Sequence, residues 1–185
     1  KGGSVLEMIG KIQSLAVDKT GTLTEGKPAV DQILKIGSLS EVQILEIASS
    51  LEAHSTHPLA LAIIEFSKLK NITPREVGNF LNIPGKGIEG KINGKSYILG
   101  NHKFMHSLGL CTPEVENKIQ QLEQRSSSIV IVAQKGGSQG VVGIISLKDR
   151  IRENAVDSLQ KIKKAGVKNI TMLSGDNSRT ANEVG

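Results

Sequence analysis

Two short apolar stretches at opposite ends of the chain, each running into an aspartate, constrain the fold more than any other feature. Ile12–Val17 is followed by Asp18, and Val167–Leu173 is followed by Ser174-Gly175-Asp176. Short apolar runs bounded by turn residues are typical of buried strands, and apolar residues at helical spacing precede the second run. The pattern predicts an α/β domain whose two halves lie far apart in the sequence.

The residues between these ends show the pattern of antiparallel strands with helices. Apolar spacing predicts a helix over Glu41–Leu51 and a second helix beginning at Pro58, which together form a helical hairpin. Asn93-Gly94 between two short runs predicts a β-hairpin, and Ser128–Ala133 and Gly140–Leu147 are predicted strands. We therefore expect an α+β domain inserted into the α/β domain.

The composition suits two small domains, a split one at residues 1–32 and 144–185 and an inserted one at 33–143. The 185 residues are 38% hydrophobic and 22% charged, which excludes a disordered chain. One cysteine excludes an internal disulfide and a metal site built of several cysteines. The net charge of +5 forms no single basic run, and there are only three Phe, one Tyr and no Trp, so we expect no nucleic-acid partner. No apolar run is long enough to span a bilayer, so we expect this chain by itself to be soluble.

The string Asp18-Lys19-Thr20-Gly21-Thr22-Leu23-Thr24 carries the clearest chemistry. Open parallel sheets place their active sites at the carboxyl ends of their strands, where Asp18 is expected to lie. A carboxylate can attack a phosphoryl group and form an aspartyl-phosphate, which requires charge and donors around the phosphoryl oxygens. Lys19, Thr20 and Gly21 supply a cation, a hydroxyl and a backbone that a ligand can approach closely.

Asp18-Lys19-Thr20-Gly21-Thr22 resembles the phosphorylation signature of the P-type ATPases, whose catalytic domain has a haloacid-dehalogenase-like, Rossmannoid fold. Leu23–Pro28 and Lys1-Gly2-Gly3 resemble the heavy-metal-transporting branch, and the resemblance extends over essentially the whole chain. It implies that Asp18 accepts the γ-phosphoryl group of ATP. It also implies Mg²⁺ bound by the Asp18 carboxylate and the Thr20 main-chain carbonyl.

Ser55-Thr56-His57-Pro58-Leu59-Ala60 is the second motif, with Glu52 about one helical turn before it. A histidine directly before a helix-starting proline is held in a fixed orientation, although by itself it is equally typical of a surface loop. The string resembles the His-Pro motif of the heavy-metal pumps. That resemblance implies that Glu52 and His57 belong to the ATP-binding site, and His54 matches no motif position.

Gly85-Lys86-Gly87-Ile88-Glu89-Gly90 fits the G-x-G-x-x-G pattern, but a predicted hairpin follows it, whereas the dinucleotide-binding version opens a helix. The remaining alternatives are close approach of the backbone to a ligand and a plain glycine-rich turn. The family resemblance implies that Gly85 and Gly87 line the nucleotide pocket. It also places Asn101 of Gly100-Asn101 near the adenine or ribose, with an ordinary turn residue as the rival interpretation.

Thr171-Met172-Leu173-Ser174-Gly175-Asp176-Asn177 resembles a family segment that usually reads Thr-Gly-Asp. Ser174 preserves the hydroxyl, and with Asp176 it is expected at the phosphoryl site together with Lys19 and Thr20. Asp149 matches a family aspartate at the junction of the two domains. A helix N-cap is a compatible role for the same residue.

The resemblance implies a membrane pump that couples ATP hydrolysis to transport of a heavy-metal cation, with this region in the cytoplasm. The cation would be bound by transmembrane helices outside this chain, and an actuator domain of the same parent protein would be a partner. Motif similarity favours the Zn²⁺, Cd²⁺, Pb²⁺ or Co²⁺ pumps, with a Cu⁺ exporter as the alternative. The family's later Gly-Asp-Gly-x-Asn-Asp segment is not in these 185 residues, so we expect nucleotide binding with little or no turnover.

Two other classes of function stay open at this point. A soluble phosphohydrolase of the haloacid-dehalogenase type usually has a second aspartate two residues after its nucleophile, and here that residue is Thr20. A nucleotide-binding module without chemistry of its own is the other alternative. Titration of the chain and of its His57→Ala variant with ATP would separate this binding module from the pump region and from the phosphohydrolase.

Overall fold

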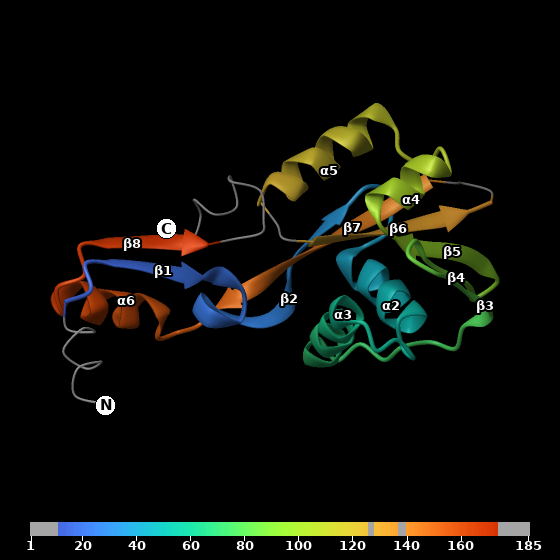
Figure 1. The fold of residues 1–185 in the computed structure, drawn as a ribbon. Helices are drawn as coiled ribbons and strands as arrows, with labels where there is room; N and C mark the ends of the chain where they lie inside the picture. The colour runs from blue at the N-terminus through green and yellow to red at the C-terminus, as the bar shows by residue number, and fades with distance from the viewer. Residues whose placement is uncertain (1–10, 126–127, 137–139, 174–185) are drawn as a thin grey trace. The chain divides into compact units, whose positions relative to one another are not determined.

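The computed structural model describes residues 11–125, 128–136 and 140–173 (Figure 1). The chain forms two compact units, which we call the split unit (Lys1–Lys27 and Asp149–Gly185) and the inserted unit (Pro28–Lys148). An α/β domain interrupted by an α+β domain is therefore the observed architecture, as predicted. The functional roles of the two units stay predictions.

The described part of the split unit is a two-stranded parallel sheet with one helix. Strand β1 (Ser14–Asp18) pairs with β8 (Asn169–Leu173), and Asp18 lies opposite Leu173. Helix α6 (Ala155–Lys164) precedes β8. We expected buried strands, but the residues of both strands alternate between exposed and half-buried, because no second layer covers this sheet within the described residues.

The inserted unit is organised around a six-stranded sheet of order β2-β7-β6-β5-β4-β3, in which β3 to β7 pair antiparallel. The strands are β2 (Thr24–Lys35), β3 (Gly78–Ile83), β4 (Gly87–Ile92), β5 (Lys95–Gly100), β6 (Ser128–Lys135) and β7 (Gly140–Ile151). The predicted hairpin is confirmed: Ile92 pairs with Lys95, and Asn93 and Gly94 both have positive φ, as a two-residue primed turn requires.

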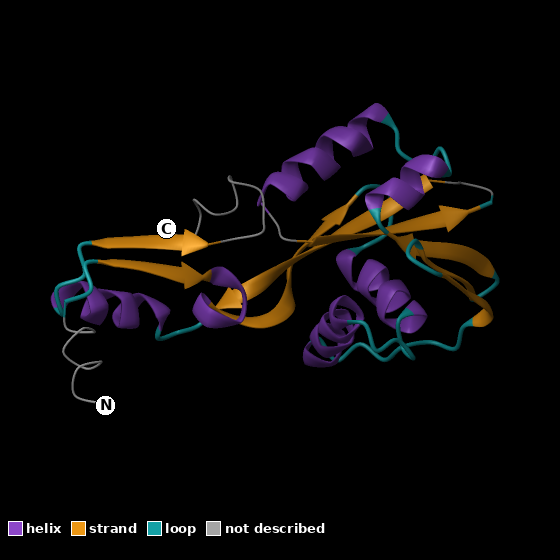
Figure 2. Cartoon of the chain, viewed as in Figure 1, coloured by secondary structure: helices purple, strands orange, loops and turns teal. Residues whose placement is uncertain are grey.

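Four helices cover the two faces of this sheet (Figure 2). They are α2 (Glu41–Leu51), α3 (Pro58–Leu69), α4 (His102–Ser107) and α5 (Pro113–Arg125). The predicted helical hairpin is α2 with α3, and Ser40 caps α2 through a reciprocal capping box with Gln43. Helices α2 and α3 pack on one face, and α4 and α5 pack on the other.

Successive residues of the central strands enter two separate cores. In β6, Val130 and Val132 pack with α2 and α3, whereas Ile131 and Ala133 pack with α4 and α5. This alternation follows from the two-residue period of a strand. Because both faces are covered, β6 is continuously apolar from Ile129 to Ala133, unlike the half-polar strands of a sheet with one wet face.

Three elements were not predicted, and one residue has a different local role from the alternative considered for it. Strand β2 begins in a polar stretch and contains Pro28, which is tolerated because β2 is an edge strand. Strand β3 and the short helix α4 also lack a clear period. A helix cap was a compatible role for Asp149, but Asp149 lies within β7, and Asn154 occupies the N-cap position of α6. None of the helices in the described residues is both long and apolar enough to cross a membrane.

The packing of β7 against α2 gives a first prediction. A Cβ atom at Gly143 would lie 2.6 Å from Cδ1 of the fully buried Ile44. Gly143→Ala should therefore lower the free energy of unfolding by about 1–3 kcal/mol through overpacking, and Ile44→Ala by about 2–5 kcal/mol through the cavity it leaves. The double variant should cost less than the sum, because Ile44→Ala removes the clashing atoms. Urea unfolding followed by circular dichroism measures all three, and strict additivity would contradict this account.

Candidate nucleotide and phosphoryl site

Asp18 ends β1 and begins a wide turn, η1 (Lys19–Leu23), which carries the predicted phosphorylation motif. Thr20 and Gly21 break the helical backbone of this turn, and Gly21 has a φ of +78°, a conformation that favours glycine. Asp18 and Thr20 are exposed, whereas Lys19 is only 4% exposed. The turn therefore presents the predicted nucleophile and the hydroxyl to solvent, and it buries the lysine.

Thr24 and Asp149 fix this turn from inside the split unit. The hydroxyl of Thr24 lies 2.6 Å from Oδ2 of Asp149 and 3.0 Å from the Lys19 carbonyl, and it accepts a bond from the Gly21 amide. Since a hydroxyl has one proton and bonds to a carboxylate are the stronger, we assign that proton to Asp149. Oδ1 of Asp149 accepts from the Lys27 amide at 3.0 Å. Both oxygens of Asp149 thus hold the chain, one at the Thr24 hydroxyl and the other at the Lys27 amide.

Arg152 is a further clamp that the sequence analysis did not identify. Its backbone amide donates to the Leu23 carbonyl at 2.9 Å, and its guanidinium donates to the carbonyls of Thr24 and Gly21 at 3.0 and 3.1 Å. Asp149 and Arg152 together therefore fix the carbonyls and hydroxyl of the loop that follows Asp18. In the sequence, Asp149 and Arg152 are close together in Asp149-Arg150-Ile151-Arg152, but this spacing does not indicate that they contact the loop after Asp18.

In the inserted unit, five residues predicted for the nucleotide site line one cavity of about 690 Å³. They are Glu52, His57, Gly85, Gly87 and Asn101. Apolar residues of the sheet, among them Ile88, Leu99 and Val130, complete the wall. An apolar cavity with a few placed polar groups is typical of a small-molecule site. The individual binding roles of these residues stay predictions.

Glu52 supplies a carboxylate that the fold leaves open. The residue is buried at the C-terminal end of α2, and its Oε2 atom has no hydrogen-bond partner among the described residues. Burial raises the pKa of Glu52 above the ordinary value of 4.5, and a hydrogen bond from Ser55 and the charge of His57 act in the opposite direction. A buried acceptor without a partner costs free energy, so it suits a ligand that brings a donor.

His57 is the N-cap of α3, and Pro58 is the first residue of that helix. Nδ1 of His57 accepts a hydrogen bond from the Leu59 amide at 3.2 Å. This bond requires the tautomer with its proton on Nε2, so the ring is oriented and retains one donor. The fixed orientation expected from the His-Pro sequence is therefore observed, and its cause is helix capping.

The glycines and Asn101 have local structural roles beside the cavity. Gly85 occupies a turn with a φ of +70°, and a Cβ atom at Gly87 would lie 2.1 Å from the Leu99 carbonyl on the neighbouring strand. Asn101 caps α4 by accepting from the Phe104 amide, and it donates to the Gly85 carbonyl at 3.1 Å. These residues build the wall of the cavity, and the rival interpretation of Asn101 as a local structural residue accounts for both groups of its amide.

Phe80 also lines the cavity, and no sequence pattern indicated it. The register of β3 against β4 shifts between Gly78 and Leu81, and Asn79 at this bulge has a φ of +49°. A bulge changes the direction in which nearby side chains point. Phe80 is 48% exposed, which leaves an aromatic ring available to a flat ligand.

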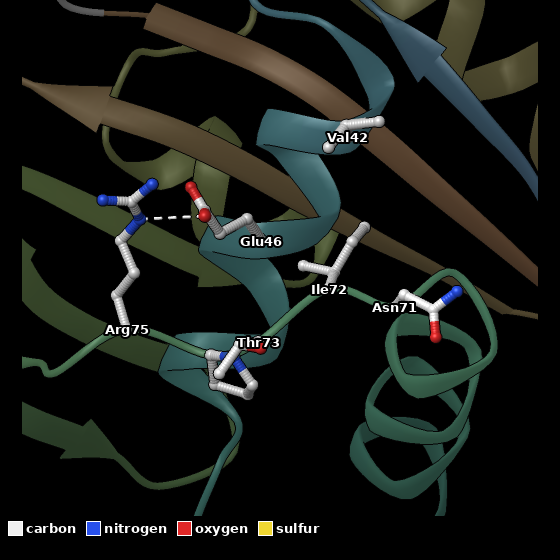
Figure 3. Close-up of a pocket in the computed structure, with 7 residues that line it drawn as sticks. Val42, Glu46, Asn71, Ile72, Thr73 and Arg75 are labelled. Carbon is white, nitrogen blue, oxygen red and sulfur yellow. Dashed lines mark ion pairs between the residues drawn. The ribbon is translucent and has the colours of Figure 1, made fainter.

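A second, smaller cavity of about 420 Å³ lies between α2 and the segment that follows α3 (Figure 3). An ion pair of 2.8 Å between Arg75 and Glu46 crosses it. The cavity contains none of the residues predicted from the sequence, and its charged groups pair with each other. It therefore offers no open polar group comparable to Glu52.

The structure describes most, but not all, of the predicted site. Ser174 and Asp176 lie outside the described residues. Leu173, the residue directly before Ser174, pairs with Asp18, so β1 and β8 deliver their carboxyl ends to the same edge of the sheet. The nucleotide-site residues belong to the inserted unit, and Asp18, Lys19, Thr20 and Asp149 belong to the split unit.

Known protein families and solved structures show which proteins this chain is similar to. The model of the haloacid dehalogenase-like hydrolase family matches residues 12–185. The chain belongs to this family. A probable cadmium-transporting ATPase of Staphylococcus aureus is 36% identical over 190 residues, covering 100% of this chain and 26% of the relative. The copper-exporting P-type ATPase B of Archaeoglobus fulgidus is 40% identical over 166 residues, covering 90% of this chain and 23% of the relative.

Solved structures agree with these relatives. A zinc-transporting PIB-type ATPase superposes with a TM-score of 0.84 at 32% identity, covering 100% of this chain and 29% of that one. The catalytic domain of the CPx-ATPase CopB-B gives a TM-score of 0.67 at 29% identity, with coverages of 98% and 60%. The resemblance to heavy-metal-transporting P-type ATPases, and the predicted fold class, are confirmed. The chain spans about a quarter of the length of the curated relatives it matches.

The raised pKa of Glu52 gives a prediction about stability and pH. The native state holds the Glu52 proton more tightly than the unfolded state, whose pKa is near 4.5. Stability contributed by this group is therefore full below pH 4.5 and is lost as the pH rises through the native pKa. Glu52→Gln should raise the melting temperature relative to the wild type more at about pH 7 than at about pH 4. Thermal unfolding at both values checks this, and an equal effect at both would contradict it.

The hydrogen bonds that hold the η1 turn give another prediction about stability. Thr24→Val removes the hydroxyl that bonds to Asp149, so it should lower the free energy of unfolding of the split unit by about 1.5–3 kcal/mol. Thr24→Ser keeps the hydroxyl and is the matched control. Denaturant unfolding compares the two variants. If Thr24→Ser destabilised as much as Thr24→Val, the lost methyl packing would explain the effect and the hydrogen bond would not.

Proposed function

We propose that this chain is the ATP-binding and phosphorylation region of a membrane pump that transports heavy-metal cations. In this proposal it lies on the cytoplasmic side of the membrane. The relatives named as cadmium-, copper- and zinc-transporting ATPases support the class of protein. Both cadmium and copper transporters are among them, so the cation stays at the level of a heavy metal. The motif similarity to Zn²⁺ and Cd²⁺ pumps is the basis for preferring that branch over Cu⁺.

The cavity of the inserted unit is the observation that carries the nucleotide part of the proposal. The adenine amino group is a donor that the open Oε2 atom of Glu52 can accept. The Nε2 proton of His57 is then available to an acceptor of the nucleotide. Phe80 and the apolar wall suit the flat face of the base.

Asp18 is the proposed phosphoryl acceptor. One carboxylate oxygen attacks the γ-phosphorus in line, the bond to the β,γ-bridging oxygen breaks, and ADP leaves with that electron pair. The hydroxyls of Thr20 and Ser174, the Lys19 ammonium group and backbone amides of the loop are the proposed donors to the phosphoryl oxygens. Asp176 belongs to the same proposed site. Asp149 acts as a positioning residue, because both of its oxygens already hold the loop.

The donor set at Asp18 fits Mg²⁺, which prefers hard oxygen ligands. The Asp18 carboxylate and the Thr20 main-chain carbonyl would hold the ion, and both residues are exposed at the end of β1. The ion would neutralise charge on the γ-phosphate when bound. Hydrolysis of the aspartyl-phosphate and transport itself are proposals for the longer parent protein, including its actuator domain.

A titration with ATP tests the nucleotide site. His57→Ala should weaken binding about three- to tenfold, the equivalent of one neutral hydrogen bond. Glu46→Gln is the matched control for Glu52→Gln, because Glu46 lies on the same helix but is paired with Arg75 in the other cavity. We expect Glu52→Gln to weaken ATP binding and Glu46→Gln to leave it unchanged. Unchanged affinity in His57→Ala would contradict its assignment to the site.

Labelling from γ-phosphate-labelled ATP with Mg²⁺ separates the remaining classes. A pump region forms an acid-stable, base-labile phosphoprotein that Asp18→Asn abolishes, with little steady-state release of phosphate. A soluble phosphohydrolase would release phosphate continuously from small phosphate esters. A pure binding module would bind ATP and form no phosphoprotein.

A further inference from the structure

The inserted unit contains a second cluster of chemically active side chains, on the face opposite α2 and α3. His102, at the start of α4, Cys111, in the α4–α5 connection, and Glu116, on α5, each offer one metal-ligand atom, and these atoms all lie within 4.8 Å of one another. All three residues are half-buried. None of them lines the nucleotide cavity.

We propose that His102, Cys111 and Glu116 form a binding site for a thiophilic divalent cation, Zn²⁺ or Cd²⁺. Imidazole nitrogen, thiolate sulfur and carboxylate oxygen are the ligands that zinc takes in proteins. In a tetrahedral site with bonds of 2.0–2.3 Å, the ligand atoms lie about 3.3–3.8 Å apart. The three atoms lie within 4.8 Å of one another, so they would approach by up to about 1–1.5 Å to bind one ion.

Both ring nitrogens of His102 face glutamate carboxylates. Its Nδ1 atom lies 3.2 Å from Oε1 of Glu123, and its Nε2 atom lies 2.7 Å from Oε2 of Glu116. A histidine that binds a metal usually donates its other ring N–H to a carboxylate, which fixes the tautomer and orients the ring. Glu123 is placed for this supporting role at Nδ1, and a cation bound by Nε2 would replace the 2.7 Å contact between Nε2 and Oε2 of Glu116.

Glu116 has an oxygen that its surroundings leave open. Its Oε1 atom is buried and accepts no hydrogen bond among the described residues. His106 is the nearest cation candidate, but its Nε2 atom lies 3.9 Å away, beyond hydrogen-bonding distance. A cation between these side chains would satisfy Oε1, and His106 or water would supply the fourth ligand.

Cys111 supplies the sulfur ligand of the cluster, and its thiol proton must be displaced when a cation binds. Burial, together with the charge and hydrogen bonding of Glu116, raises the pKa of the Cys111 thiol to about 11. At neutral pH such a thiol is protonated and is a poor nucleophile. A bound Zn²⁺ or Cd²⁺ displaces the proton of a coordinating thiol. Each ion would thus exchange one thiol proton for a metal–sulfur bond.

The test uses Cd²⁺ and the untagged chain, without nucleotide. Cys111 is the only cysteine, so an ultraviolet thiolate-to-Cd²⁺ charge-transfer band reports on this residue alone. We expect a band that saturates at one ion per chain and is absent in Cys111→Ser. Glu116→Gln should weaken binding by at least tenfold, and Glu123→Gln by about 10–100-fold, the usual effect of losing a supporting carboxylate.

Glu114→Gln is the matched control. Glu114 lies on the same helix, carries the same charge and pairs with Lys118 at 2.6 Å outside the cluster, so its loss should leave Cd²⁺ binding unchanged. Equal weakening by Glu114→Gln and Glu116→Gln would overturn the site, as would the absence of a band at millimolar Cd²⁺. Circular dichroism checks that each variant is folded. As an independent readout, Zn²⁺ should raise the melting temperature of the wild type and of Glu114→Gln, but not of Cys111→Ser.

Discussion

The inserted unit depends on one constraint: its central strands are buried on both faces. Because neighbouring residues of a strand point to opposite sides, every residue of β6 from Val130 to Ala133 must be apolar, and each face needs its own helices. The α2–α3 face carries the proposed nucleotide cavity, with Leu99 and Val130 in its wall. The α4–α5 face carries His102, Cys111 and Glu116. The sheet thus separates two chemically different environments within one small unit.

Much of this arrangement could be predicted from the sequence, where local signals were strong. The helix α2 was predicted with the bounds it has, because a regular apolar period marks it. The β4–β5 hairpin could also be predicted, because Asn-Gly favours a two-residue turn that fixes the register of its strands. The cavity residues could be assigned only through resemblance to a family. Glu52, His57 and Gly85 are not close in the sequence, and no period indicates that they line one cavity.

The elements that could not be predicted are those whose residues are chosen by tertiary contacts. Asp149 lies in a strand and not at a helix cap, because Thr24 and Lys27, more than 120 positions away in the chain, bind its carboxylate. Phe80 reaches the cavity through a bulge at Asn79, and a bulge has no reliable sequence signal. Strand β2 tolerates Pro28 because it lies at the edge of the sheet, and the order of strands in a sheet has no local sequence signal. The local sequence propensities do not indicate any of these tertiary contacts.

The adjacent residues Asn101 and His102 connect the two faces of the sheet. Asn101 caps α4 and holds the Gly85 carbonyl at the nucleotide cavity, whereas His102 joins the same short helix to Glu116 and Glu123 on α5. A cation that fixed His102 against α5 would also restrain α4, and with it the Asn101 amide at the cavity wall. A nucleotide pressing on the Gly85 turn would act on α4 from the other side. By linkage, any effect of the cation on nucleotide affinity must equal the effect of the nucleotide on cation affinity. Helix α4, which carries no clear sequence signal, is therefore the element through which the two proposed sites would influence each other.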